Sequence, residues 1–374
     1  MKIGYDAKRI FHNATGLGNY SRDMIRILSA TYPEHQYLLY NPKPGKIDRL
    51  KPDGSIVQEH RPNSWIWRQL NSLWRQGPIL KQADKDNIDI YHGLSGELPR
   101  GIDSANFKSV VTIHDLIFVT HPEMYKPADR KIYFNKFKYA ADQADVVIAI
   151  SEQTKADITQ YLGTDPSKIK VVYQTCHPLF KSRIDPEEAK QIRYKHALPQ
   201  EFIITVGTIE PRKNLLSLLK AVKDSNYHVA AIGQPTKYFK EVSEYIAKNG
   251  MKDRMHFIHD IQLPDLAALY QQAKMMVYPS LVEGFGIPII EALYTKTPVI
   301  CHEKGVFPEA AGPSSVYIDM NNIKQIRYAI DKVWNDRIQQ HNMTTDGLAF
   351  VQRFNDDVIA RDMMNVYLQL VNKK

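Results

Sequence analysis

The sequence predicts an α/β protein built from two doubly wound parallel sheets, each covered by helices. The chain has 374 residues, which exceeds the size at which one hydrophobic core usually serves a whole protein. Short β-branched segments alternate with amphipathic stretches of helical period, and this is the pattern of a parallel sheet wrapped by helices. The alternation starts again after a charged, proline-containing stretch at 176–192. We therefore expect a boundary near residue 180, with domains at 1–180 and 181–353.

The expected strands of each domain are separated by stretches long enough for a crossover helix. In the first domain they lie at 2–7, 36–41, 88–93, 109–115 and 145–151. Between the first two strands, four apolar side chains share one helical face: Tyr20, Met24, Ile27 and Leu28. In the second domain the strands lie at 202–208, 228–233, 255–260, 274–280 and 297–302. Doubly wound sheets bind ligands beyond the carboxyl ends of their strands, so the residues that follow each strand are searched first.

Composition and charge restrict the class of protein. With 43% apolar and 24% charged residues the chain is an ordinary globular one, and its apolar runs fall far short of the ~20 residues that cross a bilayer. The start, "MKIGYDAKRIF", enters a strand without an apolar signal region, so we expect a cytoplasmic protein. Cys176 and Cys301 match no metal spacing, and no disulfide is expected. The net charge of +8 favours anionic partners such as phosphates, nucleic acid or a membrane surface.

A basic pair follows the first expected strand of the second domain. In "IEPRKNLLSLLKAV", Pro211 can open a helix, which places Arg212 and Lys213 in its first turn. Cations are unfavourable at a helix N-terminus unless an anion is bound there, because the free amides already make that end positive. A phosphate site would explain the pair; the alternative is a solvated Arg-Lys pair at the start of a helix.

Two glutamates flank a glycine-rich turn in "EGFGIPIIEAL". Gly284 and Gly286 would let backbone approach a ligand, and Pro288 suits the first turn of a helix that contains Glu291. If the stretch were wholly helical, Glu283 and Glu291 would be separated by about 12 Å of rise. Carboxylates accept hydrogen bonds from the paired hydroxyls of sugars, so the spacing fits an extended polar ligand. The alternative is one surface glutamate and one helix-capping glutamate.

The first domain also carries polar groups after its strands. Gly16 and Gly18 open a helix after the first strand, but Arg22 or Asp23 stands where a dinucleotide fingerprint needs its third glycine, which disfavours hydride transfer. His114 ends the strand at 109–115 and either faces a ligand or is structural.

Several motifs, in order along the chain, carry a family resemblance: "TGLGNYSRDM", "VVTIHDLIFVTHPEMY", "VVIAISEQTKADI", "GTIEPRKN", "YPSLVEGFGIPIIEAL" and "HEKGVFPEAAG". The chain resembles a retaining glycosyltransferase of family 4, glycosyl transferases group 1. The resemblance implies the GT-B fold, two Rossmann-like domains that face each other across a cleft, with a C-terminal helix at about 354–374 closing the first domain. It also implies a nucleotide-diphosphate sugar as donor, retention of the anomeric configuration and no cofactor.

The resemblance assigns roles to residues of the second domain. Arg212 and Lys213 match the basic pair that binds the diphosphate, and Glu291 matches the glutamate that holds the ribose hydroxyls. Glu283 matches the carboxylate that grips the donor sugar together with the amides of its loop, Gly284, Phe285 and Gly286. Glu283 is therefore expected to anchor sugar hydroxyls, with the leaving phosphate accepting the acceptor's proton.

In the first domain, His114 matches the histidine next to the transferring sugar, and Gly16 with Gly18 match the loop that closes over the phosphates. Two positions depart from the family pattern. Thr208 stands where some members have a phosphate-binding arginine, and "VVYQTCHP" stands where many have an Asn-Gly hinge.

The expected chemistry is charge stabilisation. Cleavage of a glycosyl diphosphate develops negative charge on the leaving oxygen, and Arg212 with Lys213 supply fixed positive charge there. The sequence has no Asp-x-Asp between a strand and a loop, so we predict metal-independent transfer. The acceptor is expected to be a glycan or a lipid-linked saccharide in surface polysaccharide or lipopolysaccharide assembly, with GDP-mannose as the first guess for the donor.

A tryptophan-rich segment at 64–85 bears on the acceptor. Trp67, Leu70 and Trp74 recur at helical spacing, with basic side chains nearby at Arg68, Arg75 and Lys81. Such a stretch could lie on the inner face of a membrane that presents a lipid-linked acceptor, as a peripheral contact. The alternative is that the tryptophans pack the core of the first domain.

Two other functions fit parts of the sequence. A sugar-nucleotide epimerase can share the two-domain fold, although it is not expected to carry this pair of glutamates. A non-enzymatic polyanion-binding protein would gather its basic residues on one face, whereas here Lys and Arg are scattered among acids. No nucleic acid partner is expected.

Overall fold

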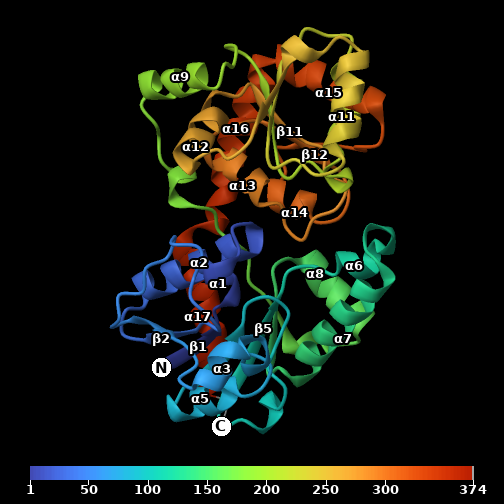
Figure 1. Cartoon of the computed structure of the whole chain (residues 1–374). Coiled ribbons are helices and arrows are strands. Elements are labelled where there is room, and N and C mark those ends of the chain that lie inside the picture. Colours follow the sequence, from blue (N-terminus) through green and yellow to red (C-terminus); the bar gives the residue numbers. More distant parts are fainter. Residues whose placement is uncertain (373–374) are drawn as a thin grey trace. The chain divides into compact units, whose positions relative to one another are not determined.

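The structure, a computed structural model, describes residues 1–372 and divides into two compact units (Figure 1). The first comprises Met1–Thr175 with the C-terminal stretch that begins at Phe354, and the second comprises Cys176–Arg353. Each unit is built on its own parallel sheet. Within the described residues, no helix is both long enough and apolar enough to span a bilayer.

The sheet of the first unit has seven parallel strands in the order β3-β2-β1-β4-β5-β6-β7. Their bounds are Lys2–Asp6 (β1), Gln36–Tyr40 (β2), Val57–His60 (β3), Ile90–Gly93 (β4), Lys108–Ile113 (β5), Val146–Ala149 (β6) and Ile169–Val171 (β7). β1 pairs with β2 on one side and β4 on the other, so the strand order reverses beside β1. Such a reversal is the doubly wound arrangement that the sequence predicts, and it opens a ligand position at the carboxyl end of β1.

Helices of the first unit follow the predicted alternation. They are Lys8–His12 (α1), Gly16–Thr31 (α2), Trp65–Gln69 (α3), Asn71–Trp74 (α4), Ile79–Lys85 (α5), Ile117–Thr120 (α6), Pro127–Gln143 (α7), Glu152–Asp157 (α8) and Asp356–Asn372 (α17). The four apolar side chains predicted to share a face of α2 are all buried, which confirms that assignment. α17, drawn in red, packs against α2 (Figure 1).

Buried polar bonds join α17 to the sheet of the first unit. The hydroxyl of Tyr367 on α17 lies 2.6 Å from Nδ1 of His92 on β4 and 3.3 Å from the hydroxyl of Tyr5 on β1. At the start of α17, Asp356 forms an ion pair of 2.7 Å with Arg26 of α2. Because buried polar groups must find partners, the two contacts of Tyr367 fix the register of α17 on the sheet.

The second unit has a six-stranded parallel sheet in the order β10-β9-β8-β11-β12-β13. The bounds are Ile203–Val206 (β8), Val229–Ile232 (β9), Met255–Ile258 (β10), Met275–Tyr278 (β11), Val299–His302 (β12) and Val316–Ile318 (β13). Its helices are Pro186–Lys195 (α9), Leu215–Val222 (α10), Phe239–Lys248 (α11), Leu263–Gln272 (α12), Ile287–Tyr294 (α13), Phe307–Ala311 (α14), Ile323–Asn335 (α15) and Arg337–Val351 (α16). The order reverses between β8 and β11, whose carboxyl ends carry both motifs singled out from the sequence.

Candidate active site

The basic pair lies in a short turn, which corrects one sequence prediction. Pro211–Lys213 form a 3₁₀ turn rather than the first turn of a helix, and α10 begins only at Leu215. Between them, Asn214 adopts a left-handed conformation with φ 53°, which asparagine tolerates better than most residues. Arg212 and Lys213 therefore precede α10 instead of lying in its first turn.

Both cations of this turn contact Glu283. Arg212 Nη1 lies 2.8 Å from Glu283 Oε2, and Lys213 Nζ donates to Glu283 Oε1. Arg212 is held further by the carboxylate of Glu210 at 2.8 Å and by the carbonyl of Val282 at 2.7 Å. The charges of two cations and two carboxylates thus balance locally in this structure.

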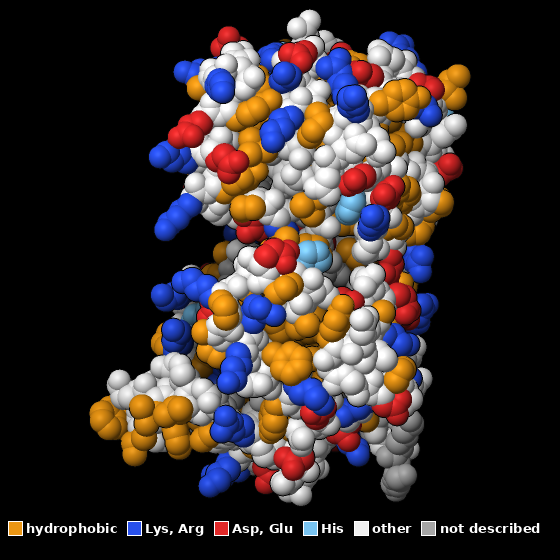
Figure 2. Space-filling model, turned by 90° about the vertical axis from the view of Figure 1, so that its right-hand side faces the viewer, with side chains coloured by type: hydrophobic (Ala, Val, Ile, Leu, Met, Phe, Trp, Pro, Cys, Tyr) orange, Lys and Arg blue, Asp and Glu red, His pale blue; other side chains and the backbone are white. Residues whose placement is uncertain are grey.

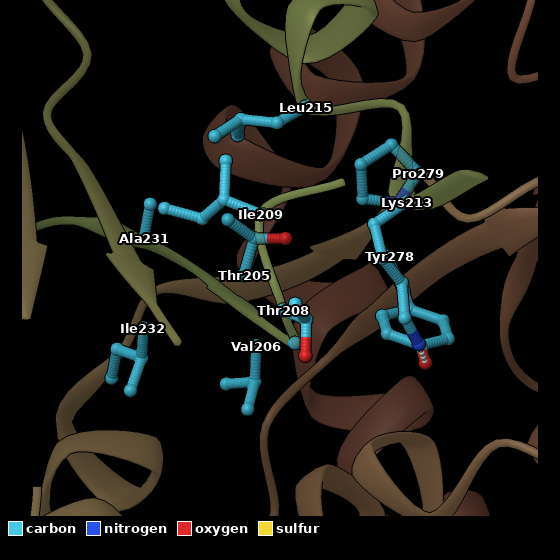
Figure 3. A pocket seen from close by; sticks show the side chains of 11 residues that line it. Thr205, Val206, Thr208, Ile209, Lys213, Leu215, Ala231, Ile232, Tyr278 and Pro279 are labelled. Atoms are coloured by element: carbon cyan, nitrogen blue, oxygen red, sulfur yellow. Dashed lines mark hydrogen bonds between the residues drawn. The ribbon is translucent and has the colours of Figure 1, made fainter. Parts of the chain in front are cut away.

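Tyr278 and Ser280 complete the cluster around Glu283. The hydroxyl of Tyr278, the last residue of β11, donates to Glu283 Oε1 at 2.9 Å and accepts from Lys213 Nζ at 2.8 Å. Figure 3 shows the side chain of Lys213 extending toward the Tyr278 hydroxyl beside the wall formed by 205–209. Ser280 Oγ donates to the same Oε1 at 2.5 Å. One carboxylate oxygen therefore collects three hydrogen bonds.

Burial and charge set the protonation states of this cluster. The exposed fractions of the side chains are 12% for Glu283, 16% for Lys213 and 23% for Arg212. Burial alone would raise the pKa of Glu283, but the charges of Lys213 and Arg212, with the bonds from Lys213 and Ser280, lower it to about 2. Burial lowers the pKa of Lys213 although Glu283 opposes the change. Glu283 is consequently a carboxylate at neutral pH and has no proton to donate.

The backbone under Lys213 requires glycine. Gly207, just beyond β8, has φ 147°, and a Cβ there would lie 3.2 Å from Lys213 Cε. At the end of β9, Gly233 has φ 155°, and a Cβ there would lie 2.0 Å from the carbonyl oxygen of Gly207. The two strand ends thus approach so closely that only glycine fits, and this leaves the space into which the lysine extends.

The loop after Glu283 leads into α13 as the sequence predicts. Gly286, with φ 111°, is the N-cap of α13, and Phe285 is buried. Glu291 lies within the helix, where its Oε2 accepts from the hydroxyl of Tyr270 at 3.2 Å. Because α13 begins at Ile287, the two glutamates are not joined by a continuous helix, and Glu283 is not a helix cap. Glu283 is therefore neither a surface glutamate nor a helix-capping one, the two roles that the alternative interpretation offered.

The glycine pair of the first unit lies at the start of α2. A Cβ on Gly18 would lie 1.8 Å from the carbonyl oxygen of Asn13, so the preceding loop can pack on the helix only at a glycine. Arg22 holds this loop through Nη1, which donates to the carbonyls of Ile10 and Asn13. A Cβ on Gly16 would meet nothing within 4 Å, so packing does not explain that glycine.

His114 follows β5 in the first unit as a neutral imidazole. Its Nε2 lies 2.9 Å from the carbonyl of Leu94, and because a carbonyl only accepts, Nε2 carries the proton. The ring packs edge-on against Tyr20 at 4.6 Å between centroids. Burial lowers its pKa to about 4, and the nearby charge of Arg9 lowers it in the same sense. His114 is therefore uncharged at pH 7, with Nδ1 as an acceptor.

Two family sequence models match the chain in tandem. The one described as "Glycosyl transferases group 1" matches residues 187–349, and "Glycosyltransferase Family 4" matches residues 14–175. Together they cover most of both units. The chain belongs to the family 4, group 1 glycosyltransferases.

Named proteins resemble this glycosyltransferase along its whole length. O-antigen chain mannosyltransferase B of Escherichia coli is 27% identical over 98% of this chain and 99% of its own. Sucrose-phosphate synthase from Thermosynechococcus elongatus shares the fold with a TM-score of 0.81 at 19% identity, covering 100% of both chains. Anabaena HepE, solved in complex with UDP-glucose, has a TM-score of 0.79 at 17% identity over 99% of this chain and 100% of that one. These likenesses identify the fold as GT-B.

In this glycosyltransferase, the sequence located the residues but missed most of their partners. The structure brings Arg212, Lys213 and Glu283 together, places Glu291 in the following helix, and puts His114 and the glycine pair in the first unit. Sequence reasoning missed Glu210, Tyr278 and Ser280. Tyr278 and Ser280 follow from the rule that strand ends carry chemistry, because both lie in "KMMVYPS" at the end of β11. Among residues 1–372, no group of three or more His, Cys, Asp or Glu side chains is placed to hold a metal ion.

Proposed function

We propose that this glycosyltransferase moves a hexose, with retention of configuration, from a nucleotide-diphosphate sugar to a glycan or lipid-linked saccharide. The observation that carries the proposal is the arginine-lysine pair at the carboxyl ends of β8 and β11, next to a buried carboxylate. The name of the E. coli relative, an O-antigen chain mannosyltransferase, supports mannose as the sugar and surface polysaccharide or lipopolysaccharide assembly as the setting. We propose GDP-mannose as the first donor to test and the cytoplasmic face of the membrane as the place of transfer.

The chemistry follows from the charges of the second unit. As the bond to the diphosphate breaks, negative charge grows on the leaving oxygen, and Lys213 and Arg212 stabilise it from fixed positions. Their side chains are held by neutral partners as well as by Glu283, namely Tyr278 and the Val282 carbonyl, so little reorganisation is needed during the reaction. These two cations perform the task that a metal performs elsewhere, and we propose that transfer needs none.

Glu283 and Glu291 serve different parts of the donor. Glu283 remains ionised, so it accepts hydrogen bonds from sugar hydroxyls and places negative charge near a sugar that becomes more positive in the transition state. It does not act as a general acid. Glu291, within α13, contacts the ribose, which does not change during transfer. His114 contributes a neutral imidazole beside the transferring sugar, and the leaving phosphate accepts the proton of the acceptor hydroxyl on the same face.

A thermal-shift screen of GDP-, UDP- and ADP-sugars tests donor binding without knowledge of the acceptor. A ligand present at 100 times its Kd adds about 2.7 kcal/mol to the stability of the folded protein. We expect a rise in Tm with one nucleotide base. The proposal is contradicted if no nucleotide sugar shifts Tm, and release of free sugar and nucleotide without any glycoside product would favour the epimerase instead.

A further inference from the structure

The segment α3–α4 of the first unit carries four large apolar side chains that are exposed. Their exposed fractions are 73% for Trp65, 55% for Ile66, 46% for Leu70 and 52% for Leu73. We call these four residues the apolar tip. Figure 2 shows hydrophobic side chains gathered on a projection at the lower left of the molecule. An exposed patch of this kind marks a surface that contacts something other than water.

The arrangement corrects the sequence prediction about which side chains face out. Trp74 is buried in the core of the first unit, and Trp67 packs partly against the same core. Arg75 also turns inward and pairs with Asp6 and Glu97. The alternative interpretation, packing in the core, is therefore right for Trp74. Leu70 is exposed, as part of the apolar tip, whose other members the helical spacing did not single out.

Within the segment that carries the apolar tip, the charge is of one sign. Between Glu59 and Asp84 the sequence contains no carboxylate. Arg68 and Lys81 are exposed, and within the described part of the chain neither forms an ion pair with a carboxylate, whereas Lys85 lies between Asp84 and Asp86. Lys81 and Lys85 line a hollow of about 540 Å³ together with Trp67 and Trp74. Apolar side chains flanked by unpaired cations fit the interface of an anionic bilayer, where tryptophan is also favoured.

We propose that the apolar tip inserts into the surface of a membrane rich in anionic phospholipids and holds the glycosyltransferase there. A second copy of the chain is a poorer occupant, because four side chains offer on the order of 400 Å², about half of the ~800 Å² that a stable interface takes from each partner. The inference deepens the proposed function, since a lipid-linked acceptor would be presented at such a surface.

Vesicle binding by the full chain tests this inference without donor or acceptor, so its failure leaves the proposed transfer reaction standing. The probes are vesicles of phosphatidylcholine alone and vesicles that also contain phosphatidylglycerol. Cosedimentation measures the fraction of protein bound to each. Trp65 belongs to the apolar tip and Trp67 lies beside it, so a blue shift of intrinsic fluorescence reports the same event. We expect tighter binding to the anionic vesicles and weaker binding as salt is raised.

Variants identify the surface. Ile66→Ser with Leu73→Ser should weaken binding by at least about tenfold, because both side chains would otherwise enter the apolar layer. Lys81→Gln should weaken binding to anionic vesicles about fivefold. Ile338→Ser, on the second unit, is the matched control, since Ile338 is 76% exposed and should leave binding unchanged. All four side chains are at the surface, so circular dichroism should show unchanged folding.

Three results would overturn the inference. The first is the absence of vesicle binding by the wild type. The second is equal loss of binding in the Ile66→Ser/Leu73→Ser and Ile338→Ser proteins. The third is a dimer, seen by sedimentation velocity without any vesicle binding, that dissociates in the double variant.

Discussion

Replacing Glu283 by glutamine tests whether this carboxylate is the internal counter-ion of the basic pair. The pKa of Glu283 is lowered from its ordinary 4.5 to about 2, and at 1.36 kcal/mol for each pKa unit this corresponds to about 3 kcal/mol of stability at neutral pH. Glu283→Gln removes that stabilisation and leaves Arg212 and Lys213 side by side without their shared anion. We expect a clearly lower Tm by calorimetry at pH 7.

The pH dependence gives the sign of the effect. Because the folded-state pKa is below the unfolded one, the stabilisation by Glu283 is fully present above about pH 4.5 and is lost as pH falls toward 2. The difference in Tm between wild type and Glu283→Gln should therefore be constant from pH 7 to 5 and shrink below that. Glu210→Gln is the matched control, since its carboxylate is 32% exposed and contacts only Arg212 of the pair. Glu210→Gln should lower Tm markedly less than Glu283→Gln does.

Ligand binding should change in the opposite direction. A diphosphate competes with Glu283 for the same N–H donors, so the variant should bind the free nucleoside diphosphate about tenfold more tightly, equivalent to one charge-assisted hydrogen bond. Its kcat should nevertheless fall, because the sugar loses its carboxylate partner. Isothermal titration of both proteins measures the affinity. Weaker binding by Glu283→Gln, with folding intact, would refute the account of Glu283 as a competing counter-ion.

Four further predictions concern the neighbours of this cluster. Tyr278→Phe removes one bond to Glu283 and one to Lys213, so kcat should fall about tenfold with a smaller change in Kd for nucleoside diphosphate; an unchanged kcat would remove Tyr278 from the site. Glu291→Gln should raise the donor KM and leave kcat nearly unchanged, because the ribose is bound equally before and during reaction; a fall in kcat alone would contradict this. His114→Ala should lower kcat. The pH profile of the wild type should show no titration of His114 between pH 5 and 8, because its folded pKa is about 4. An inflection near pH 6.5 that is present in the wild type and lost in the variant would show that His114 does titrate there. Transfer should persist in excess EDTA, and activity lost in EDTA and restored by magnesium or manganese would overturn metal independence.

The sequence predicted the layers of the fold well because its strands are apolar on both faces and its helices are amphipathic. Every strand expected in the two domains is present. β3 and β7 were missed, since "VQEH" is half-polar and "IKV" is only three residues long. β13, another three-residue strand, was missed for the same reason. Short strands at the edge of a sheet are set by pairing with a neighbour, and periodicity does not record that pairing.

The site was predictable in its residues and less so in its contacts. Arg212 and Glu283 are 71 positions apart in sequence, and only the adjacency of β8 and β11 brings them together. The sequence therefore predicted that the basic pair needs a bound anion, whereas in the structure Glu283 and Glu210 already neutralise the pair. The break at Asn214 was missed because Pro211 suits a helix start and a 3₁₀ turn equally. Helical spacing likewise grouped Trp74 with Leu70, although one is buried and the other exposed.

The proposed function requires that a nucleotide-diphosphate sugar binds at the turn that carries Arg212 and Lys213. Titrating wild type and Lys213→Ala with the nucleotide sugar selected by the thermal-shift screen tests it most directly. Lys213→Ala leaves Glu283 paired with Arg212, so the fold should persist while the diphosphate loses one of its two cations. We expect the Kd for the nucleotide sugar to rise by at least about tenfold, the worth of one charge-assisted hydrogen bond. Equal affinity in the two folded proteins would contradict it.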